Sequence, residues 1–278
     1  MYSRKSVTYQ PRYKESIFQG LFAEIKDLWR SRYVGANLFR VKLSERYQGS
    51  VLGVLWSVIT PVMMMMIMAI IFPLLMRMKI ENYVVYLFSG LVVFRFLSAA
   101  INVGGNAIVG YKALITKVAL PSMLYPTVII AVELANFVLV MVALHFVALA
   151  FSFDVNTHLL YLLAAIVVTL IFCIGVASLL SLFVVYYRDV KQVLEMVVQG
   201  LFYLTPIIYP ITMIPERFHS LMEFNVMFQF VRIFHHAIYS PIPPIWGDMV
   251  VPTLLAVITF STGLVLHRRL GRQLVFRV

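Results

Sequence analysis

From Val51 to Met76 the sequence is apolar for 26 residues, interrupted only by single polar residues and prolines. Roughly 20 apolar residues in a helix cross the hydrocarbon core of a bilayer, so this run predicts a membrane span. The composition agrees, since 62% of the 278 residues are hydrophobic and only 13% are charged. A soluble globule could not cover so much apolar volume with so little polar surface. We therefore expect an all-α polytopic membrane protein.

Further apolar runs of similar length follow, separated by short intervals that hold polar residues, glycine or proline. They predict six transmembrane helices per protomer, at about residues 51–76, 83–107, 127–151, 159–186, 193–208 and 250–266. Residues 209–246 contain five prolines and several charges, which interrupt them too often for a span. We expect re-entrant or interfacial gate helices there, on the extracytoplasmic side. The chain then divides into a cytoplasmic amino-terminal region, 1–50, and a transmembrane domain, 51–278.

The amino-terminal region carries ten of the 23 basic residues. Within it, Ile17, Leu21, Ile25 and Leu28 recur at helical spacing, which predicts an amphipathic helix lying in the headgroup layer. A second helix is expected at about Leu38 to Tyr47. A plain anchor to anionic membrane lipids remains open as the role of this region.

The distribution of charge predicts the topology. Six spans place both termini on one side of the membrane, and 18 basic residues then lie on that side against four on the other. The positive-inside rule assigns that side to the cytoplasm. The same distribution argues against nucleic acid as a partner, because the basic residues flank spans and do not gather in an aromatic-lined groove.

Motifs for catalysis are absent from the sequence. It contains no Gly-x-x-x-x-Gly-Lys-Ser/Thr loop for nucleotide phosphates, no His-Glu-x-x-His helix and no cysteine pair, Cys173 being the single cysteine. We expect no catalytic residue, cofactor or metal in this chain. Only Glu133 and Glu195 are acids expected at membrane depth, which disfavours a proton-driven carrier.

Arg95 lies inside the second expected span, where a charge is costly unless it is paired or reaches water. Glu133 on the third span is expected at a comparable depth, so we predict that the two pair or share a polar cluster. Snorkelling of Arg95 to an interface and contact with a channel substrate remain open. Asn136, on the same span as Glu133, is expected to form an interhelical hydrogen bond.

Four segments, in this order along the chain, resemble a known family. They are Arg46-Tyr47-x-x-Ser50-x-Leu52-Gly53-x-Leu55-Trp56 followed by Pro61; Leu114-Ile115-x-Lys117-Val118-x-x-Pro121; Tyr187-Arg188-Asp189-Val190; and Thr205-Pro206-Ile207-Ile208-Tyr209-Pro210 followed by Ile214-Pro215. Together they are similar to the transmembrane permease subunits of type-2 ABC exporters that move lipid-linked polysaccharides such as O-antigen, capsule and teichoic acid. A long amino-terminal extension and Arg95 depart from the pattern of that family.

The resemblance implies a homodimer in the bacterial cytoplasmic (inner) membrane, bound to two ATP-binding cassette subunits that carry the ATP and magnesium. It also implies a polyprenyl-diphosphate-linked glycan that passes through a channel between protomers. Cations at the inner interface suit the diphosphate headgroup, and aromatic faces suit sugar rings. The residues expected in these roles are Arg40, Lys42, Arg46 and Tyr47 for the headgroup and interface; Trp56, Phe72, Phe202, Tyr203 and Tyr209 for the channel; and Leu114, Ile115, Lys117, Pro121, Arg188 and Asp189 for coupling to the ATPase.

Two other functions remain open. A type-2 ABC permease for a drug or small lipid would have a closed small binding site where a glycan exporter has a long aromatic-lined channel. A membrane-embedded glycan-modifying enzyme would need a convergent acid/base or metal site. For the transporter, residues before Tyr47 are expected to tilt the first span directly, because no linker separates them, unless Gly49 and Gly53 act as hinges.

Overall fold

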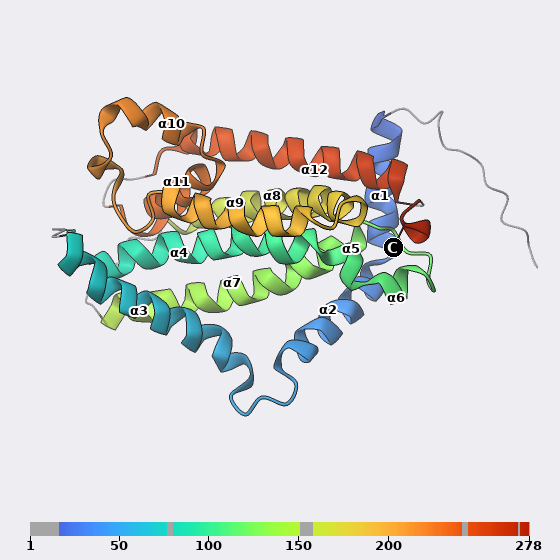
Figure 1. Cartoon of the computed structure of the whole chain (residues 1–278), viewed down its shortest axis with the longest axis horizontal. Coiled ribbons are helices and arrows are strands. Elements are labelled where there is room, and N and C mark those ends of the chain that lie inside the picture. The colour runs from blue at the N-terminus through green and yellow to red at the C-terminus, as the bar shows by residue number, and fades with distance from the viewer. Residues whose placement is uncertain (1–16, 77–79, 151–157, 241–243, 272, 278) are drawn as a thin grey trace, which may run out of the picture.

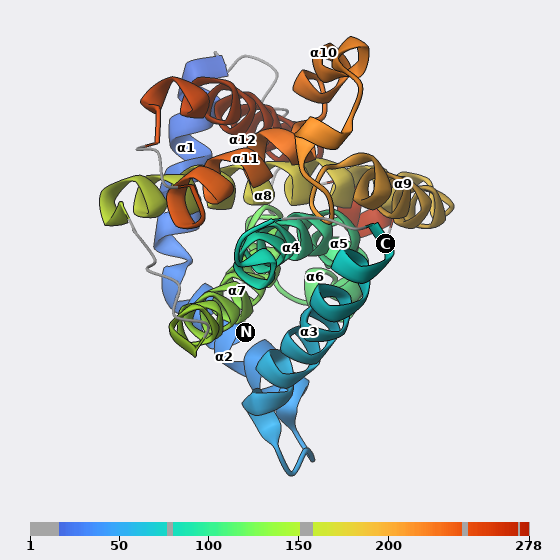
Figure 2. The same ribbon diagram turned by 90° about the vertical axis from the view of Figure 1, so that its left-hand side faces the viewer.

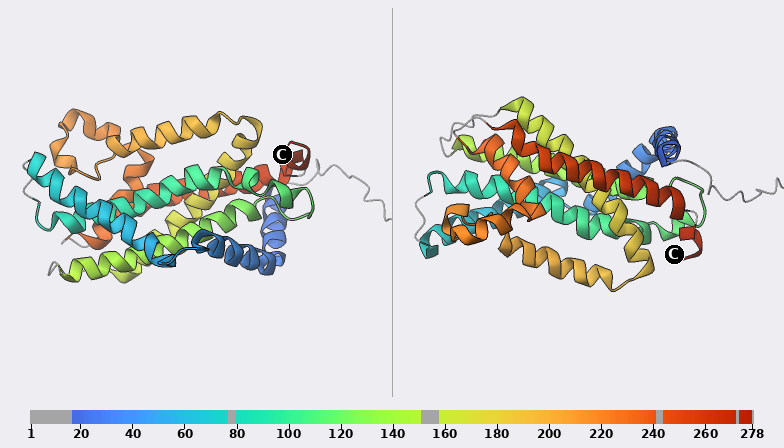
Figure 3. Two further views of the ribbon diagram at one scale, coloured as in Figure 1. Left: turned by 60° about the horizontal axis from the view of Figure 1, so that its bottom comes forward. Right: turned by 90° about the horizontal axis from the view of Figure 1, so that it is seen from above.

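A computed structural model describes residues 17–76, 80–150, 158–240, 244–271 and 273–277. These residues form helices, turns and loops without a strand. The longer helices lie along the long axis of an elongated bundle (Figures 1 and 3). They are α3 (Trp56–Met76), α4 (Tyr83–Ala99), α7 (Leu124–Ala150), α8 (Leu159–Tyr186), α9 (Val190–Leu204) and α12 (Val250–Leu270).

Among the described residues, five helical stretches are long and apolar enough to cross a membrane: Gly53–Met76, Tyr83–Gly104, Leu124–Ala150, Leu159–Tyr186 and Trp246–Leu270. They confirm a multi-pass, all-helical chain and lie where five of the six spans were expected. The remaining expected span, the fifth in chain order at 193–208, is the shorter helix α9, which has 15 residues. Fifteen residues rise about 22 Å, less than the roughly 30 Å of a hydrocarbon core. Whether α9 and the segment after it complete a sixth crossing stays a prediction.

Helix α9 ends early because of its sequence. Thr205 has an extended backbone (ψ 129°), as is usual for the residue before a proline, and Pro206 follows. The next residues are buried without being helical, so their carbonyl groups need other partners. Tyr83 on α4 donates a hydrogen bond to the Ile208 carbonyl (2.6 Å), and Tyr86 donates to the Tyr209 carbonyl (3.1 Å). Irregular backbone is thus buried in protein, the condition under which membrane proteins tolerate it.

Two short helices follow in the region expected to form the gate, α10 (His219–Glu223) and α11 (Val226–Ile238). Asn225 caps α11, because its side-chain oxygen accepts from the Met227 nitrogen (3.0 Å). Helix α11 packs against α4 and α8, and Phe230, Val231, Ile233 and Phe234 have no exposed surface. It is therefore an integral part of the apolar core of the bundle.

Among the described residues, the most extensive helix–helix contact is that of α8 with α12. At Gly175 of α8, an added Cβ would lie 2.5 Å from the Phe260 backbone nitrogen of α12, so only glycine permits this approach. His267, which is buried, joins the same helices. Its Nδ1 lies 2.9 Å from Ser122 Oγ and its Nε2 lies 3.0 Å from the Ser178 carbonyl oxygen. These contacts tie the carboxyl-terminal helix to the bundle.

The first described helix and the last long helix meet at one end of the bundle (Figure 1). There α1 (Ile17–Arg30) packs across α12, and Arg268 lies 2.9 Å from Asp27. The short helices α5 (Ala107–Gly110) and α6 (Lys112–Ile115) lie at the same end. We call this the α1 end. That it faces the cytoplasm stays a prediction, although it does bring the two ends of the described chain together.

Helices α3 and α9 are packed less closely than their neighbours. On α3, Ile70 is 61% exposed and Leu74 is 75% exposed; on α9, Met196 is 74% exposed. Figure 2 shows the two helices on the same side of the bundle with α4 between them. One face of the chain therefore presents large apolar side chains that no described residue covers.

Candidate functional site: a polar cavity at the α2–α3 junction

The chain leaves the α1 end through α2 (Arg32–Tyr47), which is longer than the helix expected at Leu38 to Tyr47. A loop then separates α2 from α3, and its two glycines have left-handed backbones, Gly49 at φ +76° and Gly53 at φ +51°. Val51, expected as the first residue of the span, is fully exposed in this loop. The expectation of a junction without a linker is therefore wrong: the loop and a short 3₁₀ turn, Gly53–Leu55, precede α3.

Side-chain hydrogen bonds bridge this loop. Ser57 at the start of α3 donates to the Tyr47 hydroxyl oxygen (2.6 Å), and the Tyr47 hydroxyl donates to Asn136 Oδ1 on α7 (2.6 Å). Asn136 donates in turn to the Val132 carbonyl of its own helix (3.1 Å). One tyrosine thus links the end of α2 to α3 and α7. The predicted interhelical role of Asn136 is confirmed.

An ion pair lies beside Tyr47. Arg46 Nη1 is 2.7 Å from Glu133 Oε1 on α7, with Arg46 42% and Glu133 13% exposed. A carboxylate largely removed from water is costly without a partner, and the Arg46 guanidinium supplies that partner. The sequence did not suggest this pair, because 87 residues separate the two and nothing local indicates that α2 returns to α7.

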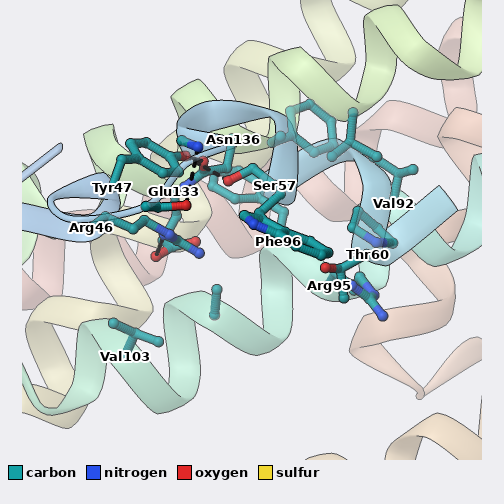
Figure 4. A pocket seen from close by; sticks show the side chains of 17 residues that line it. Arg46, Tyr47, Ser57, Thr60, Val92, Arg95, Phe96, Val103, Glu133 and Asn136 are labelled. Atoms are coloured by element: carbon teal, nitrogen blue, oxygen red, sulfur yellow. Dashed lines mark hydrogen bonds and ion pairs between the residues drawn. The ribbon is translucent and has the colours of Figure 1, made fainter. Parts of the chain in front are cut away.

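These residues border a cavity of about 530 Å³ between α3, α4 and α7. The polar residues that line it come from α3, α4, α7 and the α2–α3 junction. Aromatic and aliphatic side chains form the rest of its wall (Figure 4). Ligand sites in proteins commonly have about 300–1,000 Å³. The lining residues are Arg46, Tyr47, Ser50, Gly53, Trp56, Ser57, Thr60, Pro61, Val92, Arg95, Phe96, Ala99, Val103, Glu133, Asn136, Phe137 and Val140.

Arg95 lines this cavity from α4. It and Glu133 therefore share one polar cavity, but the ion pair of Glu133 is with Arg46. Figure 4 shows Arg95 near Thr60, away from Arg46 and Glu133. With two arginines and one glutamate, the charged side chains of the cavity leave one positive charge in excess.

The other residues expected at the headgroup lie outside the cavity. Arg40 is exposed on α2, one turn and more before the junction. Lys42 forms an ion pair with Glu45 of its own helix (2.9 Å). Only Arg46 and Tyr47 of this group are thus brought to the cavity.

The aromatic residues expected in a channel are dispersed. Trp56 is half exposed and lines the cavity, and Tyr203 on α9 is 64% exposed. Phe202 packs on Tyr203 and on Phe94 of α4, with ring centroids 5.3 and 5.4 Å apart. Phe72 is partly buried on α3, and Tyr209 donates to the Tyr203 carbonyl (2.8 Å). The role of these residues as a channel lining stays a prediction.

The residues expected to couple to an ATPase lie around α6 and the turn between α8 and α9. Ile115 is buried in a small apolar cluster with Tyr125 and Leu182, which fixes α6 against α8. Lys117, Arg188 and Asp189 are exposed, whereas Leu114 and Pro121 are partly buried. The buried side chains position the segment and the charged ones lie at its surface; their coupling to an ATPase stays a prediction.

Within the described parts of the chain, no three His, Cys, Asp or Glu side chains lie close enough together to hold a metal ion.

Comparison with known proteins gives a family. The chain is 28% identical over 193 residues to the O-antigen export system permease protein RfbA of Myxococcus xanthus, covering 69% of this chain and 74% of that protein. Two Klebsiella pneumoniae proteins of the same name are 27% and 28% identical over 186 residues, which are 66% of this chain and 71% of each relative. The model of the ABC-2 type transporter family matches residues 36–239, including every residue that lines the cavity. The chain therefore belongs to the ABC-2 type transporter family.

Proposed function

We propose that this chain is the permease subunit of an ATP-driven exporter that moves polyprenyl-diphosphate-linked polysaccharide across the bacterial cytoplasmic membrane. Two copies would form the channel and two ATP-binding cassette subunits would hydrolyse ATP, so this subunit itself would be no enzyme. The family match supports a permease, and the relatives named as O-antigen export permeases support a glycan substrate.

One observation carries the assignment of the site. The polar cavity lies where the amino-terminal helices join the first long helix, and Arg46 lies at its border with 42% of its side chain exposed. A guanidinium binds phosphate oxygens through two parallel hydrogen bonds. A lipid diphosphate arriving at the α1 end would meet this arginine as it enters the space between α3, α4 and α7.

The exposed face of α3 and α9 supports the dimer. Apolar side chains such as Leu74 and Met196 are too exposed for a protein interior and suit either lipid or a second protomer. A channel between copies would place Trp56 and Tyr203, both exposed, beside the passing sugars. Sugar rings stack on such faces without a requirement for one sugar identity.

The α1 end supplies the surface for the ATPase. Lys117 and Arg188 are exposed there beside side chains that the small apolar cluster holds in place. Movement of the ATPase would reach α3 through α2 and the Tyr47 hydrogen bonds, since the loop between the two helices is itself exposed.

The test compares two arginines of α2. Arg46→Ala removes the cation that lines the cavity, and Arg40→Ala removes one that does not. With both variants expressed at the normal level with the ATPase, we expect Arg46→Ala to lower glycan export and substrate-stimulated ATP hydrolysis far more than Arg40→Ala. Unchanged export by a normally folded Arg46→Ala variant would reject the site. Transport of small amphiphiles without glycan export would favour a drug or small-lipid permease instead.

A further inference from the structure

Arg95 has an unusual environment for a charged residue. Helix α4 is the most buried of the five long helices, and Arg95 is the only exposed residue between Tyr83 and Ala99. Among the described residues, none forms a hydrogen bond or ion pair with its guanidinium. A charge within a membrane span is normally paired, so this arginine marks a place where water or an anion reaches the span.

Arg95 lies too far from either end of its helical stretch for its side chain to reach a membrane–water interface easily. The helical stretch Tyr83–Gly104 has 22 residues, and Arg95 lies close to its middle. At about 1.5 Å per residue, it is roughly 18 Å from one end and 14 Å from the other. Snorkelling is effective for arginines near the ends of spans. The side chain instead lines the polar cavity, beside Thr60 (Figure 4).

The other charged side chains of the cavity do not neutralise Arg95. Glu133 is already paired with Arg46 at 2.7 Å, so the excess positive charge resides at Arg95. Ser57, Thr60 and Asn136 add hydroxyl and amide groups to the same wall. The cavity is therefore a polar space, open to the surface of the chain, that holds an unneutralised guanidinium.

We propose that Arg95 is a second phosphate-binding residue, deeper in the membrane than Arg46, and that the cavity holds the ionised diphosphate of the lipid-linked substrate during transport. The inference rests on the proposed function and adds a site within it. Arg46 would receive the diphosphate at the α2–α3 junction, and Arg95 would hold it between α3 and α4. The volume of about 530 Å³ exceeds that of the diphosphate and leaves space for water and a first sugar.

The binding test uses the permease with its ATPase subunits in nanodiscs, and polyprenyl diphosphate without a glycan as the probe. Arg95→Gln removes the charge, Arg95→Lys keeps it, and Arg269→Gln removes an exposed arginine of α12 outside the cavity. We expect Arg95→Gln to raise the probe concentration for half-maximal ATPase stimulation roughly tenfold or more, the effect of losing a charge-assisted hydrogen bond. Arg95→Lys should restore most of the stimulation, and Arg269→Gln should match the wild type.

A second measurement covers the case in which Arg95→Gln does not fold. Cys173 is the single cysteine and is buried, so Cys173→Ala gives a background for Thr60→Cys, which lies beside Arg95 in the cavity and leaves that arginine in place. A water-soluble thiol reagent should modify the new cysteine, and polyprenyl diphosphate should slow that reaction. Polyprenyl alcohol, which has the same chain without phosphate, should not. Equal protection by the alcohol, or no protection by the diphosphate, overturns the proposal.

The outcomes separate this inference from the proposed function. If Arg46→Ala impairs export while Arg95→Gln leaves both export and half-maximal stimulation unchanged, the deeper site is wrong and the exporter assignment stands. If the wild-type complex exports no glycan and is not stimulated by polyprenyl diphosphate, the proposed function itself fails.

Discussion

Replacing Tyr47 with phenylalanine tests whether α2 moves α3 through side chains. The substitution keeps the ring and removes one hydroxyl, which accepts from Ser57 on α3 and donates to Asn136 on α7, both at 2.6 Å. The exposed loop between α2 and α3 would then be the direct connection that remains between those two helices at the junction.

The size of the effect follows from these two bonds. A hydrogen bond contributes about 0.5–1.5 kcal/mol net, and interhelical ones in membranes average about 0.6 kcal/mol. Two bonds therefore stabilise the attached junction by about 1–2 kcal/mol, which corresponds to a five- to thirtyfold change in an equilibrium. We expect Tyr47→Phe to fold and to hydrolyse ATP, while the glycan exported per ATP falls at least fivefold.

The assay measures exported glycan and released phosphate on the same proteoliposomes. Tyr33→Phe is the matched control, because Tyr33 is exposed on α2 and, among the described residues, its hydroxyl accepts a hydrogen bond only from the neighbouring Arg32 (3.2 Å). Its export per ATP should equal that of the wild type. A normal ratio for Tyr47→Phe, with normal expression, would refute the role of this hydroxyl in transmission.

Three further substitutions test the fold. Gly175→Val places its Cβ 2.5 Å from the Phe260 backbone nitrogen, inside van der Waals contact, so the α8–α12 contact should open and the melting temperature should fall. Gly200→Val is its control: no atom lies within 4 Å of the added Cβ, and the variant should melt as the wild type does. His267→Ala removes the 3.0 Å contact between His267 Nε2 on α12 and the Ser178 carbonyl oxygen on α8. Thermal unfolding should show that the free energy of unfolding falls by about 1–3 kcal/mol. Gly49→Ala forces a left-handed backbone on alanine at φ +76°, which costs about 1–2 kcal/mol; an unchanged unfolding midpoint would show that the loop relaxes.

The long helices could be predicted because their apolar runs are continuous. Helix α8 begins and ends at Leu159 and Tyr186, the expected residues, where polar residues flank an uninterrupted run. The fifth span could not be bounded in the same way. Its apolar pattern continues to Ile208, whereas Pro206 ends the helix at Leu204 and Tyr83 and Tyr86 stabilise the irregular backbone that follows. Those tyrosines are more than 100 residues away in sequence.

The candidate site was predictable only in part. Arg46 and Tyr47 were identified by a motif, and Arg95 and Glu133 by their cost in a membrane span. The pairing of Arg46 with Glu133 depends on the angle at which α2 crosses α7, which Gly35 permits because its position lies against Leu124. Hydropathy carries no information about such a crossing. The loop at Gly49 was likewise hidden, since apolar residues such as Val51 continue the pattern of the span through it.

Export by purified components tests the central claim most directly. The permease and its ATPase subunits would be reconstituted in proteoliposomes with a polyprenyl-diphosphate-linked polysaccharide on the ATPase side, and glycan reaching the lumen would be measured by protection from an added glycosidase. We predict protected glycan that accumulates with ATP, is absent with a non-hydrolysable analogue and is strongly reduced by Arg46→Ala. Accumulation that is independent of ATP, or no protected glycan from a complex whose ATPase the substrate stimulates, would contradict the account.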